Sequence, residues 1–220
     1  MNDPVIDTDI HPVPDPERIA EFLPPLWRDR YLSGNRGPGS LGYWNPNGVM
    51  RRDAVLDDGT RIEAQPAALL EHHFDAFNIA YGILNVAGFA FILSPEPDYA
   101  ASLAAATNDV FIADWLPRDP RLRMSLVVPM GDPDLAAREI HRVGDHPGVV
   151  QVLLPGGSPM PYGKRYFHPI YAAAVEHNLP VALHPGPEGV GISGQPLAAG
   201  YPGSYLEWHT GWRLCSRTNS

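Results

Sequence analysis

Residues 148–186 read GVVQVLLPGGSPMPYGKRYFHPIYAAAVEHNLPVALHPG, and this stretch indicates the fold of the chain. Two short and almost continuously apolar runs, at 148–155 and 179–186, flank a helical stretch at 169–178. Continuous apolar runs of this length are typical of strands in a parallel sheet whose two faces are both covered. The stretch therefore predicts a strand, a crossover helix and a second strand parallel to the first.

The same alternation continues towards the N-terminus. Apolar strands are predicted at 5–10, 79–86 and 123–129, each followed by a polar or helical segment. Five such units predict an α/β protein with a parallel sheet covered by helices. Two folds remain open at this point, namely a doubly wound open sheet and a (β/α) barrel.

Helices between these strands are predicted from the spacing of apolar residues. In the first, Leu70 and Phe74 are followed by Phe77, at positions i, i+4 and i+7. Asp132 and Pro133 predict the start of another helix, as N-cap and first helical residue. The helix that follows SPEPD at 94–98 has an apolar stripe of five residues: Tyr99, Leu103, Ala106, Val110 and Ala113.

Polar side chains lie at the carboxyl ends of strands that are far apart in the sequence. Asp9 and His11 end the first strand, Asn85 ends the second and His184 ends the fifth. Functional groups gather at this end of the strands in both candidate folds. Only a barrel brings residues of well-separated strands together across one mouth, so this placement favours the barrel.

The pair Asp9 and His11 points to a metal site. Side chains two residues apart on a strand share a face, so both can reach one ion, and His184 could supply a third ligand. One carboxylate with imidazoles suits zinc, or manganese or iron in a more open site. The alternative is that Asp9 and His11 only cap the end of the strand.

A phosphatase site is a second interpretation of the same stretch. An apolar strand ending in Asp-x-Asp could use Asp7 as the nucleophile on phosphorus and Asp9 as the general acid. Such a site also needs a lysine followed by an acidic pair on a strand. The single lysine is Lys164, and no adjacent acidic pair follows it, so this interpretation is disfavoured.

Composition limits the class of protein. With 220 residues, 44% of them hydrophobic and 19% charged, the chain is long enough for one globular domain. A net charge of −9 argues against nucleic acid and anionic membranes as partners. Cys215 is the single cysteine, which excludes an internal disulfide. Neither a secretory signal nor an apolar run of about 20 residues occurs, so we expect a cytoplasmic protein.

Two loops are candidates for substrate contacts. The irregular stretch 33–66 is expected to be an inserted loop or lid over the site, and Arg51 within it is a candidate substrate-binding residue. Tyr43, Trp44 and Arg52 belong to the same stretch. After the fourth strand, Tyr162, Lys164 and Arg165 could bind a substrate carboxylate, and His168 could line the pocket. The alternative for each arginine is simple solvation.

Three segments resemble a known family. DTDIHP at 7–12, residues 161–186 and YLEWHTGW at 205–212, which contains His209, are similar to the amidohydrolase superfamily, in its amidohydrolase-related, aminocarboxymuconate-semialdehyde decarboxylase-like branch. The resemblance implies a distorted (β/α)8 barrel with a divalent metal, usually zinc, at its mouth. It also implies that Asp9, His11 and His184 are the metal ligands. The implied function is that of a hydrolase or non-oxidative carboxy-lyase acting on a small carboxylated substrate, which can be aromatic.

The sequence departs from this family at its C-terminal end. A sixth-strand histidine and an eighth-strand aspartate complete the family's site, whereas this sequence stops soon after the fifth strand. We therefore expect a single partial TIM-barrel domain over 1–220, truncated and with about five β/α units, and leave the catalytic residues unassigned. Two unpaired sheet edges would favour poor solubility or a homo-oligomer. A catalytically inactive fragment that acts only through association is the alternative to an enzyme.

Overall fold

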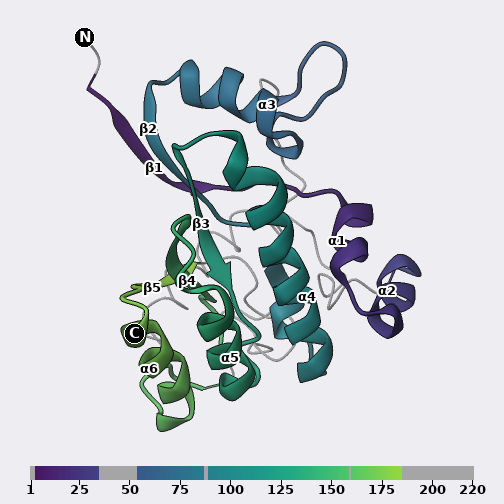
Figure 1. The fold of residues 1–220 in the computed structure, drawn as a ribbon, viewed down its shortest axis with the longest axis vertical. Coiled ribbons are helices and arrows are strands. Elements are labelled where there is room, and N and C mark those ends of the chain that lie inside the picture. Colours follow the sequence, from purple (N-terminus) through teal and green to yellow (C-terminus); the bar gives the residue numbers. More distant parts are fainter. Residues whose placement is uncertain (1–2, 35–53, 87–88, 159, 185–220) are drawn as a thin grey trace, which may run out of the picture.

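The computed structural model describes residues 3–34, 54–86, 89–158 and 160–184. Five strands form one sheet in the order in which they occur along the chain, and every neighbouring pair is parallel. The strands curl into half of a barrel (Figure 1), as predicted for an incomplete TIM barrel with five β/α units. Their bounds are β1 (Val5–Ile10), β2 (Ile79–Leu84), β3 (Leu122–Val127), β4 (Val149–Pro155) and β5 (Val181–His184).

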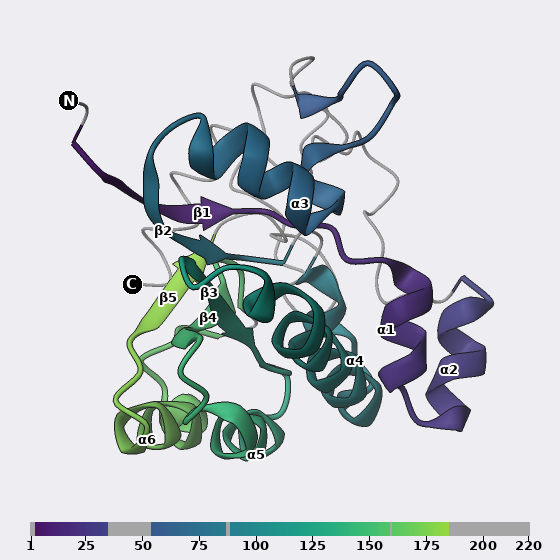
Figure 2. The same cartoon turned by 45° about the horizontal axis from the view of Figure 1, so that its top comes forward.

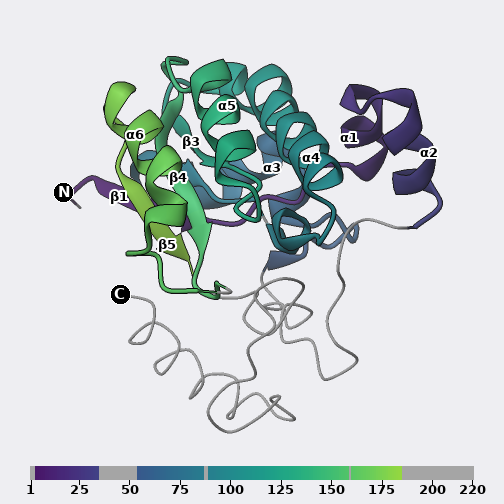
Figure 3. The same ribbon diagram turned by 90° about the horizontal axis from the view of Figure 1, so that it is seen from below.

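Helices cover one side of the sheet. In the view of Figure 3, α4, α5 and α6 form a row beside the strands, and α1 and α2 extend beyond α4. Of the helices described, none is both long and apolar enough to cross a membrane. The α-helices are α1 (Pro16–Phe22), α2 (Pro25–Leu32), α3 (Pro66–Leu69), α4 (Pro97–Val110), α5 (Pro133–Val143) and α6 (His168–Glu176). Shorter helical segments are η3 (Ile62–Ala64), η4 (Leu70–Asp75), η5 (Phe89–Leu93), η6 (Phe111–Trp115), η7 (Leu116–Arg118) and η8 (Arg165–Phe167).

Close contact between η4 and β2 identifies the helix-facing side of the sheet. A Cβ atom at Gly82 would lie 2.3 Å from Cζ of Phe74 in η4 and 2.5 Å from Cδ1 of Ile10, so glycine permits this approach. Because side chains alternate along a strand, Asn85, three residues after Gly82, points to the opposite face. That face is the concave side of the half-barrel, opposite α3 and η4 in Figure 2.

Two of the predicted apolar stripes end earlier than expected. Phe74 is fully buried, but Phe77 is 61% exposed, and Ala113 is exposed as well. The segments η4 and η6 are π-helical, and a π-turn contains more residues than an α-turn, which rotates the following side chains away from the core. The prediction that Phe77 and Ala113 continue the buried stripes is therefore wrong.

Helix α5 begins as predicted. Asp132 is its N-cap and accepts hydrogen bonds from the backbone N–H groups of Asp134 and Leu135, while Pro133 occupies the first turn. We expect Asp132→Ala to lower the free energy of unfolding by about 1 kcal/mol, since two helix N–H groups lose their acceptor. Urea denaturation measures this, and Asp132→Asn, which keeps an acceptor oxygen, should stay close to wild type. Equal losses in both variants would contradict the capping role.

A buried polar group ties the helix layer to the sheet. Asn108 of α4 donates to the carbonyl of Val127 at 2.9 Å and to Oε1 of Glu139 at 2.7 Å. It also accepts the N–H of Val127 at 3.1 Å. The buried carboxylate of Glu139 is paired with Arg142, whose pKa is raised first by Glu139 and also by Asp109. These contacts join α4, α5 and β3 without leaving the charge of Glu139 uncompensated.

The predicted insertion at 33–66 is only partly described. Residues 35–53, which include Arg51, Tyr43, Trp44 and Arg52, lie outside the described residues. The described remainder forms an isolated antiparallel bridge between Val55 and Arg61, followed by η3. The carbonyl of Glu63 in η3 accepts the N–H of Val13 at 2.8 Å, so this part of the insertion contacts the segment that leaves β1. Its role as a lid stays a prediction.

Candidate metal centre

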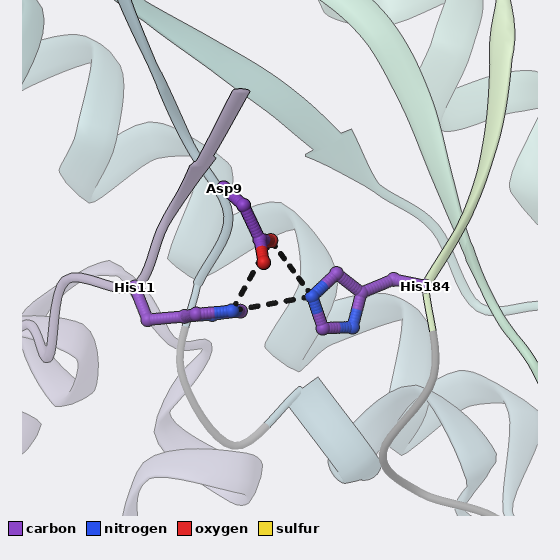
Figure 4. Close-up of side chains that lie close together, drawn as sticks. All are labelled: Asp9, His11 and His184. Atoms are coloured by element: carbon purple, nitrogen blue, oxygen red, sulfur yellow. Dashed lines mark hydrogen bonds and ion pairs between the residues drawn. The ribbon is translucent and has the colours of Figure 1, made fainter. Parts of the chain in front are cut away.

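Asp9, His11 and His184 meet at the mouth of the half-barrel. Asp9 belongs to β1, His11 follows directly after it, and His184 is the last residue of β5. Oδ1 of Asp9 lies 3.3 Å from Nε2 of His11 and 2.9 Å from Nε2 of His184, and the two Nε2 atoms are 3.2 Å apart. Figure 4 shows the three groups pointing towards one another from the two edge strands of the sheet.

The separations within this cluster fit a single divalent ion. Ligand atoms that each lie about 2.1 Å from one ion, at angles near 90–110°, are about 3.0–3.4 Å apart. Two of the three observed separations, 3.2 and 3.3 Å, lie within this range, and the third, 2.9 Å, is just below it. Among the described residues, no other group of three histidine, cysteine or acidic side chains has ligand atoms so close together. Two imidazoles with one carboxylate form a donor set for zinc, manganese or iron.

The cluster keeps Asp9 ionised. Hydrogen bonds hold the pKa of its carboxyl far below the ordinary value, with the largest contribution from His11, the next from His184 and a smaller one from Asn85. Partial burial acts in the opposite direction and is outweighed. Asp9 is therefore a carboxylate at neutral pH, and its negative charge can compensate that of a bound cation.

Asn85, directly after β2, contacts both candidate ligands at the end of the first strand. Its Nδ2 donates to Oδ1 of Asp9 at 3.0 Å, and its backbone carbonyl lies 3.1 Å from Nδ1 of His11. The carbonyl can only accept, so Nδ1 of His11 carries the proton of that bond. When an ion replaces the proton that Nε2 shares with Asp9, the lone pair of the ring lies on Nε2. This is the tautomer that a metal ligand in this position needs.

Two further polar residues connect to Asn85 from the middle of the sheet. Oγ of Ser125 in β3 donates to Oδ1 of Asn85 at 2.5 Å, and Nε2 of Gln151 in β4 donates to Oγ of Ser125 at 2.7 Å. The sequence predicts that Asn85 lies at the functional end of its strand, but it assigns no role to Asn85, Ser125 or Gln151. The sequence does contain a usable signal, because Ser125 and Gln151 are polar residues within the largely apolar strands β3 and β4.

Asp7 lies outside this cluster. Its Oδ2 pairs with Nε2 of His73 at 2.8 Å, and its Oδ1 accepts the N–H of Asp9 at 3.0 Å. The strand pairing between β1 and β2 shifts register between Asp7 and Ile10, which explains why Asp7 and Asp9 do not share a direction despite their spacing. The geometry gives no support to Asp7 as a nucleophile.

The predicted substrate-binding residues lie in different environments. Tyr162 is buried, its hydroxyl donates to the carbonyl of Pro155 at 2.6 Å, and its ring packs on Phe167. This hydroxyl therefore fixes the loop to the end of β4. Arg165 in η8 and His168 at the start of α6 are exposed. Arg51 and His209 lie outside the described residues, and the substrate roles of all these residues stay predictions.

Sequence comparisons identify relatives over much of the chain. A family model described as Amidohydrolase matches residues 6–210. The gamma-resorcylate decarboxylase of Rhodococcus jostii (strain RHA1) is 31% identical over 121 residues, which are 50% of this chain and 37% of that protein. The protein of the same name from Rhizobium radiobacter is 28% identical over 118 residues, which are 50% of this chain and 36% of that protein. The matches thus span just over a third of these relatives.

Solved structures share the same half-barrel. The 5-carboxyvanillate decarboxylase of Novosphingobium aromaticivorans, in complex with manganese, has a TM-score of 0.57 at 23% identity, covering 82% of this chain and 50% of that one. The 2,6-dihydroxybenzoate decarboxylase from Rhizobium has a TM-score of 0.53 at 20% identity, covering 82% and 49%. This chain spans about half the length of these structures, and at such identities the likeness establishes the fold alone.

Proposed function

The chain belongs to the amidohydrolase family, and from this premise we propose that it is a metal-dependent, non-oxidative decarboxylase for a small hydroxylated aromatic carboxylic acid. The observation that carries the proposal is the convergence of Asp9, His11 and His184 from β1 and β5 at separations that fit one ion. The names of the curated relatives favour decarboxylation over hydrolysis, because both are gamma-resorcylate decarboxylases.

We propose zinc or manganese as the ion. The two imidazoles favour zinc, and the exposed carboxylate of Asp9 is equally suitable for manganese. Manganese is the ion in the complex of the 5-carboxyvanillate decarboxylase. When bound, such an ion supplies a Lewis acid that orients carboxylate and hydroxyl oxygens. Asp9 would contribute the charge of the site, and His11 and His184 its neutral donors.

The proposed reaction breaks the bond between the aromatic ring and the carboxylate. Carbon dioxide leaves, the bonding electrons stay on the ring carbon, and a proton takes the place of the carboxylate. Hydroxyl groups beside the carboxylate make that carbon electron-rich enough to accept the proton. Arg165 and His168, which follow β4 on the exposed surface, are the described candidates for holding the substrate carboxylate.

The direct test is metal-dependent decarboxylation of 2,6-dihydroxybenzoate. We expect the manganese- or zinc-loaded chain to release carbon dioxide and 1,3-dihydroxybenzene in equal amounts, measured by chromatography of the aromatic product. Benzoate, which has no hydroxyl group, should not react, and chelation of the metal should abolish turnover. A folded, metal-loaded chain that neither binds nor decarboxylates hydroxybenzoates would overturn the proposed reaction while leaving the metal site intact.

A further inference from the structure

The ligands from β1 are weakly fixed by packing. The side chain of Asp9 is 62% exposed and that of His11 is 39% exposed, so neither rotamer is determined by a close-packed environment. Asn85, by contrast, is only 2% exposed. A ligand cluster that keeps its geometry before an ion arrives needs hydrogen bonds from rigid neighbours.

Every polar group of Asn85 is engaged. The Nδ2 group donates to the carbonyl of Thr8 at 3.1 Å and to Oδ1 of Asp9 at 3.0 Å, and Oδ1 accepts the hydroxyl of Ser125. The backbone N–H donates to the carbonyl of Ile10 at 2.7 Å, and the backbone carbonyl faces Nδ1 of His11. One buried residue therefore contacts four consecutive residues, 8–11, at the end of β1 and directly after it.

The network also fixes the orientation of the Asn85 amide. Thr8 and Asp9 present only acceptors to it, so a flipped amide would place two oxygens against Oδ1 of Asn85. On the other side, the hydroxyl proton of Ser125 is directed to Asn85 because Gln151 donates to the oxygen of the same hydroxyl. The direction of donation thus runs from Gln151 through Ser125 and Asn85 to Asp9.

From this series of hydrogen bonds we propose that Asn85 is a positioning residue for the metal ligands. The inference rests on the proposed metal centre. Its amide holds the carboxylate of Asp9 against the two histidines, and its carbonyl selects the tautomer of His11. Ser125, which is 3% exposed, and Gln151 keep the amide in the orientation that Asp9 requires. Ser125 in β3 and Gln151 in β4 therefore contribute to the geometry of the metal ligands at the mouth of the half-barrel.

The test compares metal affinity with folding in three variants. Co²⁺ is the probe, because its visible absorption reports the number and arrangement of its ligands, and Mn²⁺ affinity follows by competition. We expect Asn85→Ala to weaken binding about 10- to 100-fold and to change the Co²⁺ spectrum, as is typical when a partner of a metal ligand is removed. Ser125→Ala leaves the bond between Asn85 and Asp9 in place but removes the contact that holds Oδ1 of the amide, so we expect a smaller loss of about three- to tenfold.

Asn108→Ala is the matched control. Asn108 is as buried as Asn85 and also hydrogen-bonds to a strand backbone, but its partners are Val127 and Glu139, away from the cluster. Its replacement should lower thermal stability without changing Co²⁺ affinity or the Co²⁺ spectrum. Unchanged affinity and spectrum in folded Asn85→Ala would overturn the inference. If Asn85→Ala does not fold, unchanged affinity in Ser125→Ala overturns it instead.

The same measurements separate this inference from the proposed function. Wild-type chain that is folded but binds neither Co²⁺ nor Mn²⁺ would show that the metal centre itself is wrong, and Asn85 would then have no ligands to position. Binding that is lost in His11→Ala and retained in Asn85→Ala would leave the metal centre intact and remove only the role of Asn85.

Discussion

Replacing His11 or His184 with alanine is expected to lower the affinity for Mn²⁺ or Zn²⁺ by about 100-fold or more. Loss of a partner outside the ligand set typically costs 10- to 100-fold in affinity, so loss of a ligand should reach at least the upper end of that range. Each variant leaves two of the three candidate donor side chains. No second histidine stands in residues 5–11 or in β5, so no neighbour on the same segment can replace the one removed. Equilibrium dialysis with metal analysis measures both the stoichiometry and the affinity.

His72→Ala is the matched control for these variants. His72 lies in η4, in the segment between α3 and β2, and is not part of the cluster. The control variant should bind one ion per chain with wild-type affinity. If His11→Ala and His184→Ala keep that stoichiometry and affinity as well, the ion is bound elsewhere, and the assignment of Asp9, His11 and His184 as ligands is wrong.

Replacing Phe74 with alanine is expected to lower the free energy of unfolding by about 3–5 kcal/mol. The Phe74 ring is fully buried between η4 and β2, where it contacts the backbone position of Gly82. Its removal leaves a cavity into which the surrounding structure relaxes only partly. Because this loss is comparable to the stability of a small domain, Phe74→Leu provides a milder variant whose unfolding can still be measured in urea.

Phe77→Ala distinguishes the observed helix geometry from the predicted one. A regular α-helix through Leu70, Phe74 and Phe77 would bury both phenylalanines, and both alanine variants would then be costly. The π-helical segment η4 leaves Phe77 61% exposed, so its replacement should change stability by only about 0.5 kcal/mol or less. A loss of several kcal/mol in Phe77→Ala would mean that the helix continues in α-helical phase.

The alternation of strands and helices could be predicted from the sequence alone, and so could three residues of the candidate site, Asp9, His11 and His184. Runs such as 148–155 are apolar at nearly every position, which predicts a strand covered on both faces, and all five predicted strands occur in the structure. The positions of Asp9, His11 and His184 at strand ends predicted that they could meet. Their convergence follows from the parallel topology, because parallel strands bring equivalent ends to one edge.

Other features depend on contacts that a linear pattern does not contain. Local helix propensity does not indicate the π-helical segments at 70–75 and 111–115. The relation of Ser125 and Gln151 to the metal centre arises from the register of β3 and β4, in which these two residues are directly paired. The different directions of Asp7 and Asp9 depend on an irregularity in the pairing of β1 with β2.

The position of the three candidate metal ligands has a consequence for the shape of the sheet. β1 and β5 are the first and last strands of the sheet order and are not neighbours in it, yet His11 and His184, which are 173 residues apart in the sequence, approach within 3.2 Å. An ion bound there would link the first and last strands of the curled sheet, β1 and β5. Because it would bind the curled arrangement and not an opened one, a 100-fold excess over its Kd would favour curling by about 2.7 kcal/mol. The reaction centre would then also determine how far the half-barrel can open.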